Sequence, residues 1–152
     1  MTRRAKGFSL IELLVTVSLV GILAAIAVPN FSSMMQKSRA DSEVSDLQRA
    51  LNFARLEAIN RGVNMKILPT TGSAWTTELS VVLSSSSEII RVVAPLSSGA
   101  TLTTTNNVAA LEFNNLGGLA SPASAVAMTY TLGSNVRTVN IGLNGRIVSS
   151  GN

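Results

Sequence analysis

An apolar run near the N-terminus constrains this chain more than any other feature. It extends over 24 residues, from Phe8 to Phe31, and as a helix it rises about 36 Å at 1.5 Å per residue. That length is sufficient to cross the hydrocarbon core of a bilayer. Because Arg3, Arg4 and Lys6 precede the run, the positive-inside rule keeps the N-terminus in the cytoplasm. We therefore expect a single pass through the inner membrane and a C-terminal domain in the periplasm.

One carboxylate, that of Glu12, lies inside this apolar run. Placing a carboxylate in hydrocarbon costs about 2.5 to 3.5 kcal/mol on insertion scales, so such a residue indicates a function and a partner. Two simpler interpretations of the run stay open on length and flanks alone. It could be a secretory signal cleaved after Ala25-Ile26-Ala27, or a plain uncleaved anchor. Neither interpretation explains Glu12.

The residue types present limit the chemistry of the chain. It has 152 residues and neither Cys nor His, so there is room for one domain besides an anchor, without disulfides and without the commonest general base and metal ligands. We therefore expect no enzyme, with no catalytic residue, no metal site and no cofactor. The net charge of +4 comes largely from the basic residues before the apolar run, because the remainder holds 9 basic and 8 acidic residues.

Beyond the apolar run, the spacing of apolar residues predicts an amphipathic helix. They recur every three or four residues and so share one face, at Ala40, Val44, Leu47, Leu51, Ala54 and Ala58. Asp41, Glu43 and Asp46 lie off this face, where we expect a solvated surface. Gly62 is a natural helix stop. We expect one long helix from Phe8 to Arg61, in which Pro29 either introduces a kink near the membrane exit or ends the membrane helix.

After Gly62 the sequence changes to short β-prone segments separated by Ser, Gly, Asn and Pro. The expected strands are 63–68, 78–83, 88–93, 100–104, 110–113, 127–132, 136–141 and 146–148, the last following an Asn144-Gly145 hairpin turn. Loops are expected at 84–87, 103–107 and 117–124, and the last should be the longest and most mobile. These elements predict an α+β fold in which the long N-terminal helix packs on an antiparallel sheet.

The stretch Lys6-Gly7-Phe8-Ser9-Leu10-Ile11-Glu12 resembles the class III signal of type IV pilins and pseudopilins. The resemblance implies that prepilin peptidase cleaves between Gly7 and Phe8 and methylates the new amine of Phe8. It also implies that Glu12 of an incoming subunit meets the Phe8 amine of its neighbour in the filament. On this basis we expect a leader at 1–7, a membrane and filament-core helix at 8–31, an amphipathic helix at 32–62 and a β-rich domain at 63–152.

A second resemblance covers the rest of the chain. The stretch from Leu51 to Val63 is similar to the helix end of the GspH/FimT branch, and Trp75, Leu111-Glu112-Phe113, Gly117 and Gly145-Arg146 fall where that branch has comparable residues. This implies a minor type IV pilin of the FimU/FimT kind, which helps to prime pilus assembly near the filament tip. The implied partners are other minor and major pilins, prepilin peptidase and the assembly platform. The alternative is a minor pseudopilin of a type II secretion system.

A third possibility is DNA binding. Some members of the FimT branch resemble DNA receptors that use a C-terminal G-R-x-R motif, and here the stretch Gly145-Arg146-Ile147-Val148 retains only the first Arg. Phosphate contacts dominate the affinity for DNA, so the loss of one cation weakens this interpretation. Arg146, Arg137 and Lys66 are the candidate DNA contacts.

Overall fold

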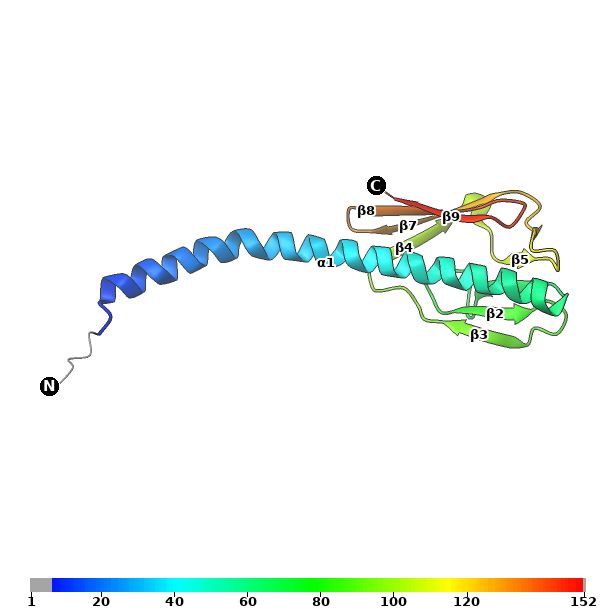
Figure 1. Cartoon of the computed structure of the whole chain (residues 1–152), viewed down its shortest axis with the longest axis horizontal. Helices are drawn as coiled ribbons and strands as arrows, with labels where there is room; N and C mark the ends of the chain where they lie inside the picture. Colours follow the sequence, from blue (N-terminus) through cyan, green and yellow to red (C-terminus); the bar gives the residue numbers. More distant parts are fainter. Residues whose placement is uncertain (1–6, 152) are drawn as a thin grey trace. The chain divides into compact units, whose positions relative to one another are not determined.

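The computed structural model describes residues 7–151, apart from the side chains of Val28 and Pro29. Of the expected leader, only Gly7 lies among the described residues. The chain divides into two compact units, the first ending at Met35 and the second beginning at Gln36. A single helix passes through both, and the strands all belong to the second (Figure 1).

The helix, α1, extends from Leu10 to Arg61 over 52 residues. It begins two residues later than expected, because Ser9 is the N-terminal capping residue. It continues through residue 29, so Pro29 does not end the helix, and a kink there stays a prediction. The helix ends where Gly62 adopts a positive φ of 68°. The N–H of Gly62 bonds to the carbonyl of Ile59 and that of Val63 to the carbonyl of Ala58, which is the Schellman arrangement.

The described residues after α1 form nine strands and one short 3-10 helix, η1 (Thr105–Asn107). All strand pairs are antiparallel. One sheet has the order β3-β2-β1-β5-β6 and the other the order β4-β7-β8-β9. The strands are β1 (Met65–Pro69), β2 (Leu79–Leu83), β3 (Ile89–Val93), β4 (Ala100–Thr104), β5 (Leu111–Phe113), β6 (Leu119–Ser121), β7 (Val126–Leu132), β8 (Asn135–Ile141) and β9 (Ile147–Gly151).

Three details of the strands differ from the expectation. The strands form two sheets rather than one. The expected mobile loop 117–124 contains β6, which pairs with β5. Its formation depends on Asn114, whose side-chain oxygen accepts the N–H groups of Leu116 and Gly118 and so folds the chain back. The hairpin expected at Asn144-Gly145 forms between β8 and β9, but its turn spans residues 142–146, and the N–H of Gly145 bonds to the carbonyl of Gly142.

The core of the second unit joins α1 to both sheets. Figure 1 shows β2 and β3 on one side of the helix in that view, and β7, β8 and β9 on the other. The predicted apolar face of α1 is confirmed, since each of its six residues is at most 4% exposed. Phe113 of the first sheet and Tyr130 of the second are fully buried in the same cluster. The α+β fold is therefore confirmed, and one helix packs against both sheets.

Two glycines in hairpin turns lie against α1: Gly117 in the turn between β5 and β6, and Gly145 in the turn between β8 and β9. Arg55 of α1 donates from Nε to the carbonyl oxygen of Gly117 at 2.8 Å. Gly145 has a φ of 73°, and a side chain on it would meet the Gly117 carbonyl and the Arg55 guanidinium. Only glycine fits at such a backbone approach. Three residues from the stretches that resemble the GspH/FimT branch, Arg55, Gly117 and Gly145, therefore meet at one point.

Candidate assembly site

The first turn of α1 forms a reciprocal cap between Ser9 and Glu12. The N–H of Ser9 donates to Oε2 of Glu12 at 3.0 Å, and the N–H of Glu12 donates to Oγ of Ser9 at 3.2 Å. This is a capping box, which satisfies two of the N–H groups left without partners at a helix start. Glu12 therefore has a local role as a helix cap besides the role in assembly expected from its place in the motif. The S-x-x-E spacing was the signal that could have shown it.

The cap places a negative charge next to the predicted cleavage point. Glu12 binds the backbone of Ser9, which directly follows Phe8, and its second oxygen, Oε1, accepts no hydrogen bond from a described residue. Nothing described lies within 4 Å of a side chain built on Gly7. The Gly7–Phe8 bond therefore lies in open surroundings, one residue before the cap.

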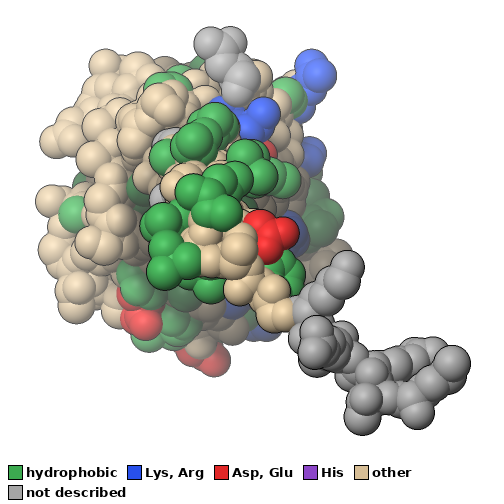
Figure 2. All heavy atoms as spheres, turned by 90° about the vertical axis from the view of Figure 1, so that its left-hand side faces the viewer, with side chains coloured by type: hydrophobic (Ala, Val, Ile, Leu, Met, Phe, Trp, Pro, Cys, Tyr) green, Lys and Arg blue, Asp and Glu red, His purple; other side chains and the backbone are tan. Residues whose placement is uncertain are grey.

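The helix after the cap presents uncovered apolar side chains. Leu10, the first residue of α1, is 78% exposed, and Phe8, just before the cap, is 84% exposed. Figure 2 shows hydrophobic side chains gathered on the face turned to the viewer. By length and composition, α1 includes a segment that could cross a membrane. The hydroxyls of Thr16 and Ser18 bond to backbone carbonyls one turn earlier, so these polar groups are satisfied within the helix. Glu12 is the one charged side chain between residues 8 and 31.

In the second unit, the expected solvated surface of α1 is wrong for Glu43. Its Oε2 accepts the hydroxyl of Tyr130 at 2.8 Å and its Oε1 accepts the N–H of Ser97 at 3.2 Å. Burial raises the pKa of Tyr130, and the neighbouring Glu43 carboxylate raises it further. Glu43 therefore links the helix to β7 and to the segment between β3 and β4. No local pattern could have shown this contact, since the two residues are 87 positions apart.

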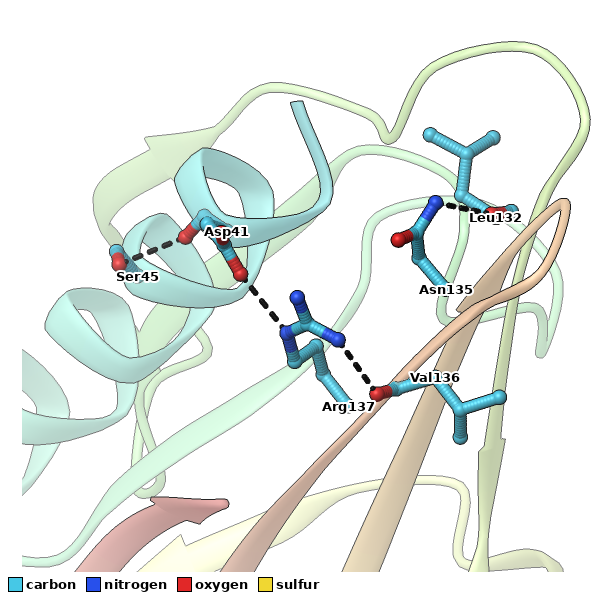
Figure 3. Close-up of polar contacts among 6 residues, drawn as sticks. All are labelled: Asp41, Ser45, Leu132, Asn135, Val136 and Arg137. Atoms are coloured by element: carbon cyan, nitrogen blue, oxygen red, sulfur yellow. Dashed lines mark hydrogen bonds and ion pairs between the residues drawn. The ribbon is translucent and has the colours of Figure 1, made fainter. Parts of the chain in front are cut away.

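Asp41 also has a structural contact rather than a purely solvated position. Figure 3 shows Arg137 extending from β8 toward α1, where its Nε donates to Oδ1 of Asp41 at 2.8 Å. A second nitrogen of Arg137 donates to the carbonyl of Val136. Arg137 is 8% exposed, so the pair attaches the second sheet to the start of the amphipathic segment. Asp46 behaves as expected and pairs with Arg49 on the exposed surface.

The three candidate DNA contacts lie on different parts of the fold. Lys66 is on β1 of the first sheet, with Nζ 3.9 Å from a carboxylate oxygen of Glu112. Arg137 is bound to Asp41 on the second sheet. Arg146 is exposed in the turn between β8 and β9. Two of the three cations therefore already have a carboxylate partner, and DNA contact by this set stays a prediction.

Both the N-terminal segment and the domain that follows it match known protein families or motifs. Residues 43–145 match the family described as Type II transport protein GspH, and residues 2–28 match the prokaryotic N-terminal methylation motif. A fimbrial protein of Pseudomonas aeruginosa is 51% identical over 55 residues, which cover 34% of this chain and 36% of that protein. The type II secretion system core protein G of Aeromonas hydrophila is 38% identical over 58 residues, covering 36% and 41%. The aligned part thus spans well under half of these curated relatives.

Two solved structures have the same fold. The type IV minor pilin FimU of Pseudomonas aeruginosa superimposes with a TM-score of 0.65 at 22% identity, covering 79% of this chain and 92% of that one. The minor pseudopilin EpsH of the Vibrio cholerae type 2 secretion system superimposes with a TM-score of 0.58 at 13% identity, covering 74% and 97%. The fold is therefore that of type IV pilin-like proteins. Because the GspH match covers most of its length, the chain belongs to the GspH family, and its N-terminus carries the prokaryotic N-terminal methylation motif.

Proposed function

We propose that the chain is a minor type IV pilin that is processed, stored in the inner membrane and assembled into a pilus, where it helps to prime assembly near the tip. The capping box at Ser9 and Glu12 carries the proposal, because it sets a carboxylate beside the predicted cleavage point at the start of an exposed apolar helix. The methylation motif over residues 2–28 supports processing of this segment.

The proposed mechanism begins with cleavage between Gly7 and Phe8, which would give Phe8 an ammonium group. A carboxylate alone in hydrocarbon is costly, and a buried charge is tolerated when it is paired. Glu12 of one subunit is proposed to pair with the Phe8 amine of its neighbour, so that the cost of each charge is offset only on assembly. Methylation of that amine retains its positive charge. The pairing would favour association and fix the axial register between subunits.

The proposed surroundings follow from the same segment. The basic residues before Phe8 favour a cytoplasmic N-terminus and a periplasmic C-terminal domain. Prepilin peptidase and the assembly platform are the proposed partners in the inner membrane, and other minor and major pilins are the partners in the filament. The domain is proposed to act as a structural subunit without catalytic activity.

A second candidate is a minor pseudopilin of a type II secretion system. The description of the matched family and the likeness to EpsH favour it, whereas the likeness to FimU favours the pilus. Both candidates share the processing and the pairing of Glu12.

Deletion of the gene with complementation separates the two candidates. Loss of surface pili with normal protein secretion supports the pilin, and loss of secretion with normal pili supports the pseudopilin. The intact mass of the protein from membranes tests processing. A methylated chain that begins at Phe8 is expected, and a chain that begins at Val28 would contradict both candidates.

A further inference from the structure

Strand β3 is an edge strand with exposed apolar side chains. It pairs with β2 on one side, and on the other side no described strand pairs with it. Ile89 is 54% exposed and Val92 is 49% exposed. The backbone N–H and C=O groups on an outer edge can template a further strand. This edge therefore offers both hydrogen-bonding groups and apolar surface.

The other sheet edges are less suited to adding a strand. β6 has three residues, and β4 and β9 are rich in Thr or in Ser and Gly. In β3, four of the five residues are Ile or Val. Proteins usually protect edges with charges, Pro, short strands or bulges. β3 has a register irregularity opposite Val81 and Val82, but no Pro and one charged residue, Arg91.

A cavity of about 270 Å³ lies beside the second half of β3. It is lined by residues 91–96, by Leu47 of α1 and by Trp75. Small-molecule pockets commonly range from about 300 to 1,000 Å³, so this cavity suits one or two side chains better than a whole metabolite. Strand addition typically combines main-chain hydrogen bonds with pockets for alternate side chains, and both features meet here.

The charges around this cavity indicate which kind of segment could bind there. Arg91 lies over the ring of Phe53, 4.9 Å from its centroid, and no carboxylate of the described residues forms an ion pair with it. The two acids that line the cavity are engaged, Glu43 with Tyr130 and Asp46 with Arg49. An incoming segment therefore meets an available cation, which favours a carboxylate on that segment.

We propose that β3 accepts an extended segment of another filament subunit, which adds as a strand, inserts an apolar side chain into the adjacent cavity and places a carboxylate near Arg91. This inference rests on the proposed function, which supplies the class of partner. It adds a side contact through the globular domain to the proposed pairing of helices.

The first test compares two edge valines in the full chain, expressed in cells that assemble filaments. Val92→Lys places a charge on the β3 edge, and Val148→Lys makes the same change on the exposed edge strand β9. We expect Val92→Lys to lower the amount of the subunit in sheared filaments at least about tenfold, relative to its membrane level, and Val148→Lys to remain near the wild type. Equal incorporation of the two variants would overturn the proposal.

Two further arms exclude other causes. The unfolding midpoints of the purified full-length Val92→Lys and Val148→Lys variants in detergent should match. Arg91→Glu, which retains the four apolar residues of β3, should also lower incorporation into filaments. A photo-crosslinking residue at position 92 should capture, in filaments, an extended segment of a different pilin that contains Asp or Glu. Capture of a second copy, of a helix or of nothing would contradict the proposal. Absence of the wild-type chain from filaments would instead contradict the proposed function.

Discussion

Arg55 and Gly117 are joined by a hydrogen bond from the guanidinium Nε to the backbone carbonyl, with Gly145 packed against both. The bond connects α1 to the turn before β6. Gly145 lies in the turn before β9, so that turn also packs against Arg55 and Gly117. Gly145 has no room for a side chain and has a positive φ, so two separate costs fall on any replacement.

Gly145→Ala should lower the free energy of unfolding by about 2 to 5 kcal/mol, since left-handed backbone costs about 1 to 2 kcal/mol and overpacking about 1 to 3 kcal/mol. Gly72→Ala is the matched control, because Gly72 has a φ of 69° and nothing within 4 Å of an added side chain. Denaturant unfolding of the full chain in detergent measures both. An equal loss for the two variants would show that the close approach at Gly145 is not tight.

Tyr130 should make stability depend on alkaline pH. Its pKa is raised in the folded state by burial and by Glu43, whereas an unfolded tyrosine titrates near pH 10. The contribution is therefore complete below about pH 10, and it declines above that value by up to about 1.4 kcal/mol per pH unit, because only the unfolded chain ionises.

Tyr130→Phe removes this titration together with the hydrogen bond to Glu43. At pH 7 the variant should be less stable by about 1 to 3 kcal/mol, because a partly buried carboxylate oxygen of Glu43 loses its donor. The difference from the wild type should narrow between pH 10 and 12. A difference that stays constant across that range would show that the phenol ionises equally in both states.

The Asp41–Arg137 pair should contribute more than an exposed pair on the same helix. A double-mutant cycle with Asp41→Asn and Arg137→Met should give a coupling of about 0.5 to 1.5 kcal/mol, which is moderate because the Asp41 side chain is 53% exposed. The control pair is Asp46–Arg49, whose side chains are 53% and 66% exposed, and its coupling should be about 0.2 to 0.5 kcal/mol. Equal couplings would mean that burial of Arg137 adds nothing to the pair.

The helix and its buried face were predictable because the pattern that specifies them is local. Ala40, Val44 and Leu47 show the helical period within one turn or two, and Gly62 marks the end. Contacts between distant segments were not predictable in this way. The sequence neighbours of Glu43 do not indicate that it accepts a hydrogen bond from the Tyr130 hydroxyl. In sequence, Glu43 therefore looks like the solvated Asp46.

The division into two sheets and the presence of β6 also depend on contacts that local sequence patterns do not indicate. Residues 117–124 are rich in Gly, Ser and Pro, which is typical of a loop, and β6 exists because Asn114 turns the chain back onto β5. In the candidate site, the motif identified Gly7, Phe8 and Glu12 as a set. The S-x-x-E spacing of Ser9 and Glu12 is the local signal for the bonds between them.

Processing should depend on the size of residue 7. Gly7→Ala is expected to be partly tolerated, and a bulky replacement such as Gly7→Leu should block cleavage, because the resemblance to prepilin signals implies that the peptidase requires a small residue there. A gel of membrane fractions shows the retained leader as slower migration. Normal maturation of Gly7→Leu would remove Gly7 from the recognition of the leader.

The central claim is that the charge of Glu12, rather than its role as a helix cap, drives assembly. Glu12→Gln separates the two, because glutamine can still close a capping box with Ser9 but has no charge. Glu12→Val removes both roles and should insert into the membrane at least as well as the wild type. Thr16→Val, which replaces a polar residue further along the same helix, is the matched control.

The most direct measurement is therefore the amount of each full-length variant in sheared filaments, normalised to its amount in the membrane. Glu12→Gln and Glu12→Val should both be reduced at least about tenfold, which corresponds to about 1.4 kcal/mol, and Thr16→Val should match the wild type. Incorporation of Glu12→Gln at the wild-type level would contradict the pairing of Glu12 with the Phe8 amine.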